Sequence, residues 1–178
     1  MRMDVHTSSK TDDWATPQHV FDKLDAEFGF KLDVCADDDN AKADDYYTVV
    51  EDGLVQDWCG FGPVWMNSPY GRTIGKWIKK AYETAQRGHT VVCLLPSRTD
   101  TSWWHRYCAK SDDIRFVSGR IAFGDGTGRA PFPSVVVDFD GKCQRQRYLG
   151  SDEFTAEVEQ SLAATDACLA SLDGYLPA

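Results

Sequence analysis

The 178-residue sequence contains no long hydrophobic run, and this absence excludes a membrane-spanning protein. No apolar stretch approaches the roughly 20 residues that a helix needs to cross a bilayer. The N-terminal stretch MRMDVHTSSKTDDW is polar and acidic and has no apolar core. We therefore expect no conventional secretory signal and a cytoplasmic location.

Closely spaced cysteines are also lacking. The six cysteines form no C-x-x-C pair and no Cys/His cluster at zinc-ligand spacing, so we expect reduced, mostly buried thiols and no metal site. The sequence further lacks the Gly-rich loop that many nucleotide-binding folds place after their first strand. Its length is sufficient for one core, which predicts a single domain over residues 1–178 with a flexible stretch at 1–13.

Basic residues are in the minority, because the net charge is −9. This argues at first sight against a nucleic-acid partner, since phosphate binding depends on Lys and Arg. However, residues 1–67 carry 5 basic and 15 acidic side chains, residues 68–149 carry 14 and 7, and residues 150–178 carry none and 6. The basic middle keeps a nucleic-acid partner open, although ordinary solvated surface charge gives the same pattern.

Apolar spacing predicts several helices. Thr16-Pro17 is typical of an N-cap followed by proline at the first helical position, and Gly29 is a stop signal. The segment from Ile74 to Ala85 places its apolar residues on one helical face. The predicted helices cover residues 17–28, 74–85, 100–110 and 151–173, the last as a C-terminal covering helix.

Short apolar segments alternate with these helices. The predicted strands cover residues 30–36, 62–67, 90–96, 114–118, 120–123 and 134–139. The alternation predicts an α/β sheet with helices on its faces. In such folds ligands lie beyond the carboxyl ends of the strands, which is where Asp33, Asn67 and Pro96 fall.

The stretch VWMNSPYG, residues 64–71, ends an apolar strand in an amide, a serine, a proline and a tyrosine. The exocyclic amine of adenine is a poor nucleophile because its lone pair is delocalised into the ring. Two acceptors aimed at its N–H bonds favour the pyramidal geometry needed for attack on a methyl group. The Asn67 amide oxygen and the Ser68 carbonyl can supply them, while Tyr70 can stack on a base swung out of the duplex. The structural alternative is a turn that contains Pro69, with Tyr70 as packing.

This stretch resembles the Asp/Asn-Pro-Pro-Tyr motif of amino-methyltransferases that use S-adenosylmethionine. Further stretches, in order, resemble the phage-type DNA N-6-adenine methyltransferase (Dam) family: SSKTDDWATPQHVFDKL, LDVCADDDNAK, VVCLLPSRTDTSWWH, and IRFVSGRIAFG with APFPSVVV. The resemblance runs from about residue 8 to residue 139. It implies a compact, single-domain Rossmann-like sheet that moves a methyl group from S-adenosylmethionine to N6 of a flipped-out adenine in double-stranded DNA.

One position departs from the family pattern. Ser68 stands where the family usually has proline, so the locked φ of that proline is lost, while the proposed carbonyl acceptor remains. Pro69 still biases residue 68 towards extended backbone. We expect reduced rigidity and retained activity, with Asn67, Ser68, Pro69 and Tyr70 as the catalytic set.

The resemblance also assigns six residues to the cofactor: Trp14, Thr16, Pro17, Asp33, Ala36 and Asp57. The first three are expected at its methionine part and Asp33 with Ala36 at the end of the strand that holds it. Asp57 is expected at the adenine amino group of the cofactor. Each has a structural alternative, such as a helix start at Thr16 or a turn acid at Asp57.

Four residues are assigned to DNA or the target base: Arg72, Arg98, Arg120 and Phe123. Phe123 is equally typical of a core aromatic. The lysines at 76, 79 and 80, together with Arg129, are further candidates for contacts with backbone phosphates. Segments 37–56, 98–113 and 124–133 are the parts of the chain that remain for base recognition.

Two other functions stay open at this point. Motifs of this kind also serve enzymes that methylate RNA bases or a protein glutamine, and the basic middle weakly favours a nucleic acid. An acidic protein that imitates DNA is a non-enzymatic alternative, but it has no reason to keep an amide-serine-proline-tyrosine sequence at a sheet edge.

Overall fold

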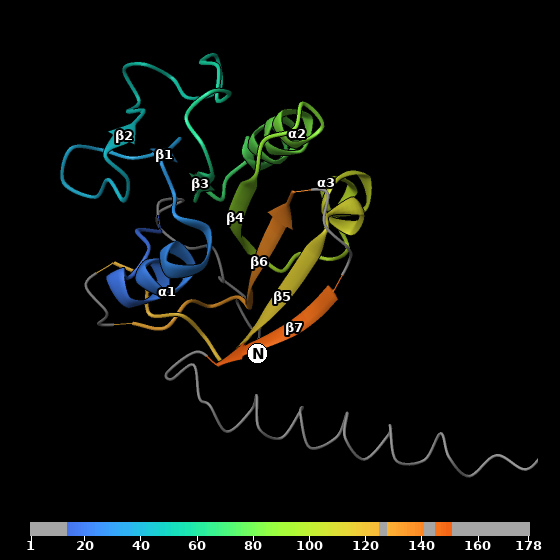
Figure 1. Ribbon diagram of the computed structural model, residues 1–178. Coiled ribbons are helices and arrows are strands. Elements are labelled where there is room, and N and C mark those ends of the chain that lie inside the picture. The colour runs from blue at the N-terminus through green and yellow to red at the C-terminus, as the bar shows by residue number, and fades with distance from the viewer. Residues whose placement is uncertain (1–13, 125–127, 141–144, 151–178) are drawn as a thin grey trace, which may run out of the picture.

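The computed structural model describes residues 14–124, 128–140 and the backbone of 145–150. Its centre is a seven-stranded sheet in the order β2-β1-β3-β4-β6-β5-β7 (Figure 1). The strands are β1 (Leu32–Asp33), β2 (Asp45–Tyr46), β3 (Val64–Met66), β4 (Val91–Pro96), β5 (Asp113–Ser118), β6 (Ser134–Phe139) and β7 (Arg145–Gly150). The expected flexible stretch 1–13 and the expected helix 151–173 lie outside the described residues.

The strand order reverses between β1 and β3. Strands β2, β1, β3 and β4 run parallel, while β6 is antiparallel to both of its neighbours, β4 and β5. After β1 the chain moves outward to β2 and then crosses back past β1 to β3. In open α/β sheets ligands bind at such a reversal, beyond the carboxyl ends of the strands. Asp33 ends β1 and Asn67 follows β3, so both lie at this point.

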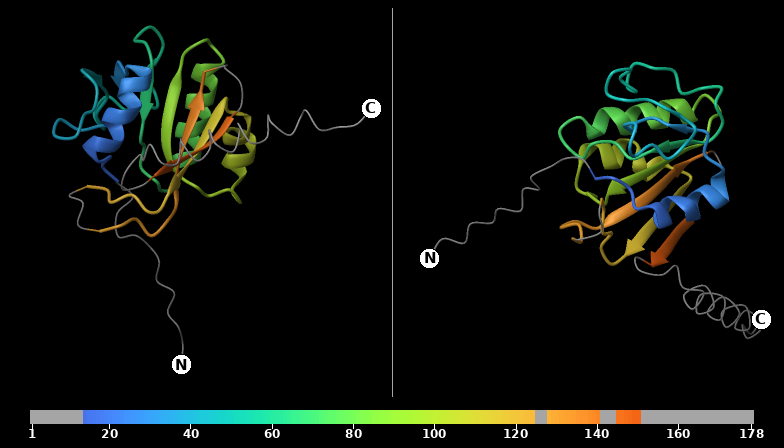
Figure 2. Two further views of the ribbon diagram at one scale, coloured as in Figure 1. Left: turned by 60° about the horizontal axis from the view of Figure 1, so that its bottom comes forward. Right: turned by 90° about the vertical axis from the view of Figure 1, so that its left-hand side faces the viewer.

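Helices cover both faces of the sheet, as the alternating pattern predicts. Helix α1 (Gln18–Phe28) lies on one face, and α2 (Ile74–Ala85) with α3 (Ser102–Arg106) lies on the other (Figure 2). Phe21 of α1 meets Trp65 of β3 edge to face at 5.6 Å between ring centroids. Strands β4 and β6 are buried along their whole length, which places the core at the middle of the sheet. Within the described residues, no helix has the length and apolarity needed to span a membrane.

Most of the predicted elements are confirmed. Helix α2 has the predicted bounds, and α1 ends at Gly29, whose φ of 65° lies in the left-handed region that favours glycine. The N-cap of α1 is Pro17 and not Thr16, because Thr16 is buried and its hydroxyl is used elsewhere. Segment 100–110 divides into α3 and a short 3-10 helix at Cys108–Lys110.

The strand predicted at 120–123 is wrong. Its alternating pattern arises because Ile121 and Phe123 are buried from a loop, without a neighbouring strand to pair with. Isolated backbone hydrogen bonds connect this loop to other segments, from Ala130 N–H to the Ile121 carbonyl and from Gly124 N–H to the Ala15 carbonyl. Strands β2 and β7 were not predicted, since both are short on apolar residues.

A buried arginine ties α1 to the far half of the sheet. Arg115 on β5 donates from Nε to Asp113 at 2.9 Å, and its two terminal nitrogens donate to Glu27 of α1. The side chains of Arg115 and Asp113 are 6% and 9% exposed, whereas that of Glu27 is 46% exposed. Asp113 faces Asp138 of β6 across the ladder. Burial, followed by the neighbouring Asp140 carboxylate, raises the pKa of Asp138 to about 7, and Arg115 acts in the opposite direction.

Arg115→Met removes the cation and leaves the buried carboxyl groups of Asp113 and Asp138 without it. We expect the free energy of unfolding at pH 8 to fall by about 3 kcal/mol, as for other broken buried ion pairs. The loss should be smaller at pH 6, because a raised folded-state pKa gives stability that is present at low pH and lost as pH rises through about 7. Urea unfolding at both pH values measures this. Glu27→Gln is the control with the smaller expected loss, and a larger loss for that control would contradict the account.

Candidate active site

A cavity of about 1000 Å³ opens where the strand order reverses. Its walls come from segment 14–16 before α1, from the ends of β1 and β3, from segment 47–54, and from residues 123–124. Segments that are far apart in the sequence therefore meet at one point. The residues assigned from the sequence that line the cavity are Trp14, Thr16, Asp33, Ala36, Asn67, Pro69 and Phe123.

The amide of Asn67 is fixed by its surroundings. Its Nδ2 donates to the Trp14 carbonyl at 2.6 Å and to Thr16 Oγ1 at 2.9 Å. Because a backbone carbonyl can only accept, the NH₂ end of the amide must face Trp14. Both amide hydrogens are then used, and the orientation of Oδ1 follows.

The Tyr70 hydroxyl holds the other end of this amide. Tyr70 Oη lies 2.8 Å from Asn67 Oδ1 and 3.0 Å from the Leu94 carbonyl, and it has one proton for these two acceptors. A carbonyl-type oxygen has two lone pairs, so Asn67 Oδ1 keeps at least one of them for a donor in the cavity.

The structure corrects the stacking role expected for Tyr70. Its ring is 2% exposed and does not line the cavity. It packs edge to face against Phe132 at 5.5 Å and Phe123 at 6.2 Å between centroids. Burial raises the pKa of Tyr70 well above its usual value. Tyr70 thus supports Asn67 from the core side. The aromatic residues that line the cavity are Trp14, Tyr47, Trp65, Trp77 and Phe123.

Ser68, which stands where the family usually has proline, places a hydroxyl group in a buried position. The residue is buried, and its Oγ has no hydrogen-bond partner among the described residues. A proline at this position has no polar side-chain atom to satisfy, so the environment of residue 68 suits an apolar side chain. Pro69 lines the cavity directly after it.

Asp33 is a buried carboxylate at the end of β1. Its two oxygens accept the Cys35 N–H at 3.1 Å and the Lys42 N–H at 3.2 Å. Burial raises the pKa of Asp33 to about 6, although both backbone bonds act in the opposite direction. A carboxylate offers about four acceptor positions, so two remain for a donor in the cavity. A bound cation at this place would stabilise the charged form.

Two residues assigned to the cofactor do not line the cavity. Pro17 is the N-cap of α1, and its carbonyl accepts the N–H groups of Val20 and Phe21. Asp57 lies on the surface, where it forms an ion pair with Arg87 at 3.0 Å, and this hydrogen bond lowers the pKa of Asp57 to about 2. Asp57 therefore has an internal partner outside this cavity, and its contact with the cofactor stays a prediction.

The arginines assigned to DNA are placed differently from one another. Arg98 lies beside the motif, because its Nη1 donates to the Tyr70 carbonyl at 3.3 Å. Arg72 is exposed at the turn before α2. Arg120 is partly buried, in the loop that leads to Phe123. None of the three lines the cavity, so their position allows contacts around it and not within it.

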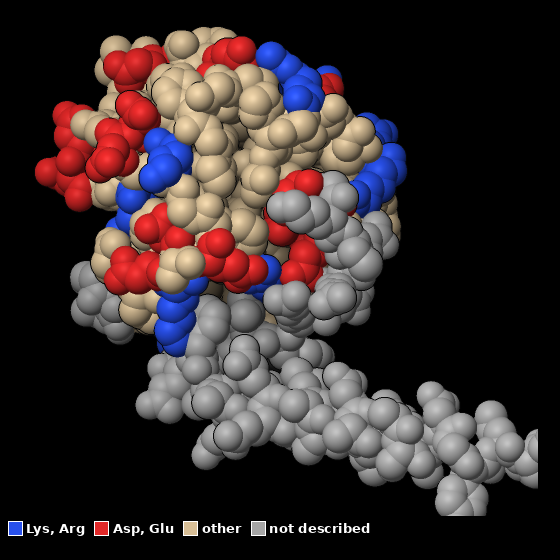
Figure 3. Space-filling model, in the orientation of Figure 1, with Lys and Arg blue, Asp and Glu red and all other residues tan. Residues whose placement is uncertain are grey.

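Segment 37–54 forms a wall of the cavity that the sequence did not reveal. β2 lies within it and pairs with β1, which returns the chain to Asp33. Only its beginning, residues 37–42, falls within the family-like stretch LDVCADDDNAK, and the rest of the segment carries no motif. Figure 3 shows acidic side chains over this region, and Lys and Arg over α2 and α3 at the upper right. The exposed acids of the segment are Asp37, Asp38, Asp39, Asp44, Asp45, Glu51 and Asp52.

The strand order, the cavity at its reversal and the Asn-Ser-Pro-Tyr sequence beside it define a methyltransferase with a Rossmann-like sheet. Residues 5–144 match the family of DNA N-6-adenine-methyltransferases (Dam), and the chain belongs to this family. It is 30% identical over 142 residues to the DNA N-6-adenine-methyltransferase of Haemophilus phage HP1 (strain HP1c1), which covers 75% of this chain and 82% of the phage protein.

Two further proteins are similar over less of their length. YfdM, a candidate methyltransferase of Escherichia coli (strain K12), is 44% identical over 48 residues, which is 26% of this chain and 53% of YfdM. The crystal structure of a predicted O-methyltransferase, Atu636 from Agrobacterium tumefaciens, aligns with a TM-score of 0.35 and 21% identity over 62% of this chain and 54% of that chain. The fold assignment rests on the strand order and the family, and not on this last alignment.

Ser68→Ala tests the cost of the buried hydroxyl. Removing an unsatisfied polar atom should raise the free energy of unfolding by roughly 1 kcal/mol, because its desolvation is no longer uncompensated. Ser111→Ala is a matched control, since the equally buried Ser111 Oγ donates to the Cys108 carbonyl at 2.6 Å and its loss should destabilise the protein. Urea unfolding of both variants measures the difference. A loss of stability in Ser68→Ala would show that this hydroxyl is satisfied in solution.

Proposed function

We propose that the chain transfers the methyl group of S-adenosylmethionine to N6 of an adenine that is swung out of double-stranded DNA. The observation that supports this most strongly is the fixed amide of Asn67 on the wall of the cavity. Membership of the DNA N-6-adenine-methyltransferase family points to the same reaction. An enzyme that modifies a base in DNA needs such a cavity, because the target atom is inaccessible within a stacked duplex.

The chemistry assigns separate roles to Asn67 and Ser68. S-adenosylmethionine supplies an electrophilic methyl group on a positively charged sulfur. Asn67 Oδ1 and the Ser68 carbonyl accept hydrogen bonds from the two N6–H groups of adenine. They stabilise the positive charge that develops on nitrogen during attack. The attack needs no general base, because the extra proton can leave afterwards. Rate enhancement then comes from positioning and from these fixed acceptors.

Asp33 is the residue best suited to hold the cofactor. Its buried carboxylate lies on the cavity wall, and burial raises its pKa, although the nearby Lys42 acts in the opposite direction. The ammonium group of the methionine part is a cation of the right chemistry for it. Trp14, Thr16 and Ala36 form the adjoining wall, whereas Asp57 has no part in the proposal.

The target base is proposed to lie against Pro69 and Phe123, both of which line the cavity with Asn67. Phe123 replaces Tyr70 as the aromatic surface for stacking. Arg72, Arg98 and Arg120 are proposed to contact DNA around the cavity, since phosphate binding depends on arginine and lysine. The acidic segment 37–54 repels phosphates, so the duplex is expected on the side away from it. A phage-encoded enzyme of this kind acts on DNA inside the host cell, so we propose the host cytoplasm as its location.

Incubation of the protein with labelled S-adenosylmethionine and unmethylated DNA, RNA or a protein extract tests the proposal. We expect label in N6-methyladenine of double-stranded DNA alone. Asn67→Ala should reduce kcat by at least about 100-fold, as for removal of one fixed acceptor, with little change in cofactor affinity. Label in RNA or in a protein glutamine would overturn the substrate, and loss of cofactor binding in Asn67→Ala would make Asn67 structural.

The pH dependence of cofactor affinity tests the role of Asp33. A cation binds the ionised carboxylate, whose pKa in the free protein is about 6. The Kd of S-adenosylmethionine should therefore rise as pH falls from 7 to 5, by up to about tenfold per pH unit below 6. Calorimetry at several pH values measures this. Asp33→Asn should bind weakly and without this dependence, and a wild-type Kd that stays constant from pH 7 to pH 5 would contradict the assignment.

A further inference from the structure

One wall of the cavity has no regular secondary structure to support it. Asp52, Gly53 and Leu54 line the cavity, and the chain from 51 to 57 consists of turns and irregular backbone. Backbone of this kind keeps a fixed position only when other groups satisfy its polar atoms. The supports of this wall are therefore part of the site.

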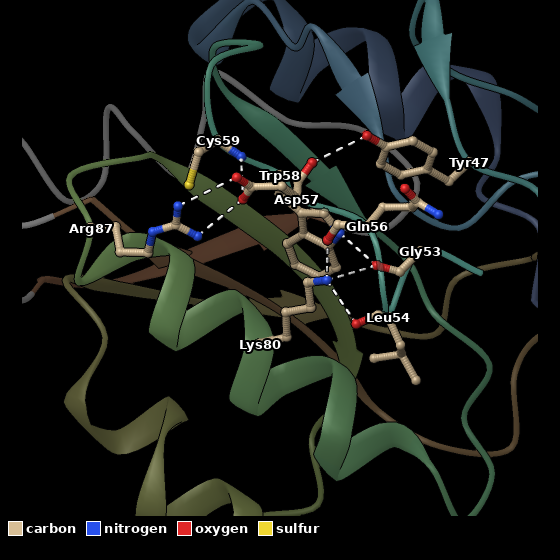
Figure 4. A network of polar contacts seen from close by, with 9 residues as sticks. All are labelled: Tyr47, Gly53, Leu54, Gln56, Asp57, Trp58, Cys59, Lys80 and Arg87. Atoms are coloured by element: carbon tan, nitrogen blue, oxygen red, sulfur yellow. Dashed lines mark hydrogen bonds and ion pairs between the residues drawn. The ribbon is translucent and has the colours of Figure 1, made fainter. Parts of the chain in front are cut away.

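Lys80 of α2 supplies the main support. Its Nζ donates to the carbonyls of Gly53 at 3.0 Å and Leu54 at 2.8 Å, and also to that of Gln56 (Figure 4). An ammonium group has three hydrogens, so this one is saturated. Burial lowers the pKa of Lys80, while the nearby Asp57 acts in the opposite direction. The phosphate contact expected for Lys80 from the sequence is thereby corrected.

Trp58 supports the same wall from beneath. Its Nε1 donates to the Gly53 carbonyl at 2.7 Å, and its ring is stacked with that of Trp77 at 6.1 Å between centroids. Lys80 Nζ lies 5.0 Å from the centroid of the Trp58 ring, a favourable cation–π distance. The two donors thus converge on one carbonyl.

Gly53 places this wall close to the end of β1. A Cβ at this position would lie 2.1 Å from the Val34 carbonyl and 3.1 Å from the Trp77 ring. The backbone of residue 53 therefore lies close to Val34, the residue that follows Asp33. Any outward movement of the wall changes the space beside that carboxylate.

We propose that Lys80 is a positioning residue for the cofactor, which keeps the Asp52–Leu54 wall in its binding position. The inference rests on the proposed function, because it takes S-adenosylmethionine as the ligand of this cavity. Loss of the ammonium leaves three carbonyls without that donor and allows the wall to move away. Cofactor affinity then falls in proportion to the fraction of molecules with the wall in place. The methyl-transfer step, once the cofactor is bound, is unchanged.

Lys80→Met tests this, because it keeps the apolar stem over Trp58 and removes only the ammonium. We expect the Kd and KM for S-adenosylmethionine to rise about tenfold, with kcat at saturating cofactor within about twofold of the wild type. In the free protein, amide hydrogen exchange of residues 53–57 should become faster. Lys79→Met is the matched control for cofactor affinity measured without DNA, since Lys79 on the same helix forms a surface ion pair with Glu83 at 3.5 Å. Lys80→Arg should restore part of the affinity.

An unchanged Kd in Lys80→Met, or a rise in the KM for DNA alone, would overturn the inference. If Lys80→Met does not fold, Trp58→Phe gives a second test, because it removes one donor to the Gly53 carbonyl and keeps the ring. It should raise the Kd in the same direction by a smaller factor, and an unchanged Kd would count against the inference. Wild-type protein without affinity for S-adenosylmethionine would contradict the proposed function as well. Normal wild-type binding with unaltered variants would contradict only the role of Lys80.

Discussion

The site depends on how one amide is held. Asn67 donates both amide hydrogens to segment 14–16, and its Oδ1 lies 2.8 Å from the hydroxyl of the buried Tyr70, so the amide has little freedom. These bonds join residues that are more than 50 positions apart in the sequence. The segment before α1, the end of β3 and the end of β4 are thereby joined at one point. A fixed acceptor of this kind costs no reorganisation when charge develops beside it, which is the physical basis of its proposed role in catalysis.

The parts of the fold that follow local rules could be predicted from the sequence. Helix α2 has a clear apolar stripe, and β4 is an unbroken apolar run, so both were found. Asp33 and Asn67 could be placed together because the ends of parallel strands meet at one edge of a sheet. The strand predicted at 120–123 is wrong because a short apolar segment can also be buried from a loop, without a partner strand.

Side-chain environments were harder to predict, because they depend on contacts between distant segments. A tyrosine after Ser-Pro was expected to be exposed and to stack on the target base. In the structure Phe123 and Phe132 pack against Tyr70, and only the fold brings these rings together. Asp57 and Lys80 illustrate the same limit. Their charge can be read from the sequence, but the partner of Asp57 is Arg87, just after the end of α2, and the partners of Lys80 are carbonyls of the 53–57 loop. The family resemblance suggested a ligand for Asp57 and the basic charge suggested one for Lys80, whereas the structure gives each an internal partner.

The most direct test is a structure of the protein with a non-reactive analogue of S-adenosylmethionine and a DNA duplex. The duplex contains the target site with its adenine still unmethylated. The account predicts a flipped adenine whose N6 lies about 3 Å from both Asn67 Oδ1 and the Ser68 carbonyl, a normal hydrogen-bond distance. An adenine bound outside the cavity, or an Asn67 amide whose NH₂ group faces the base, would contradict it.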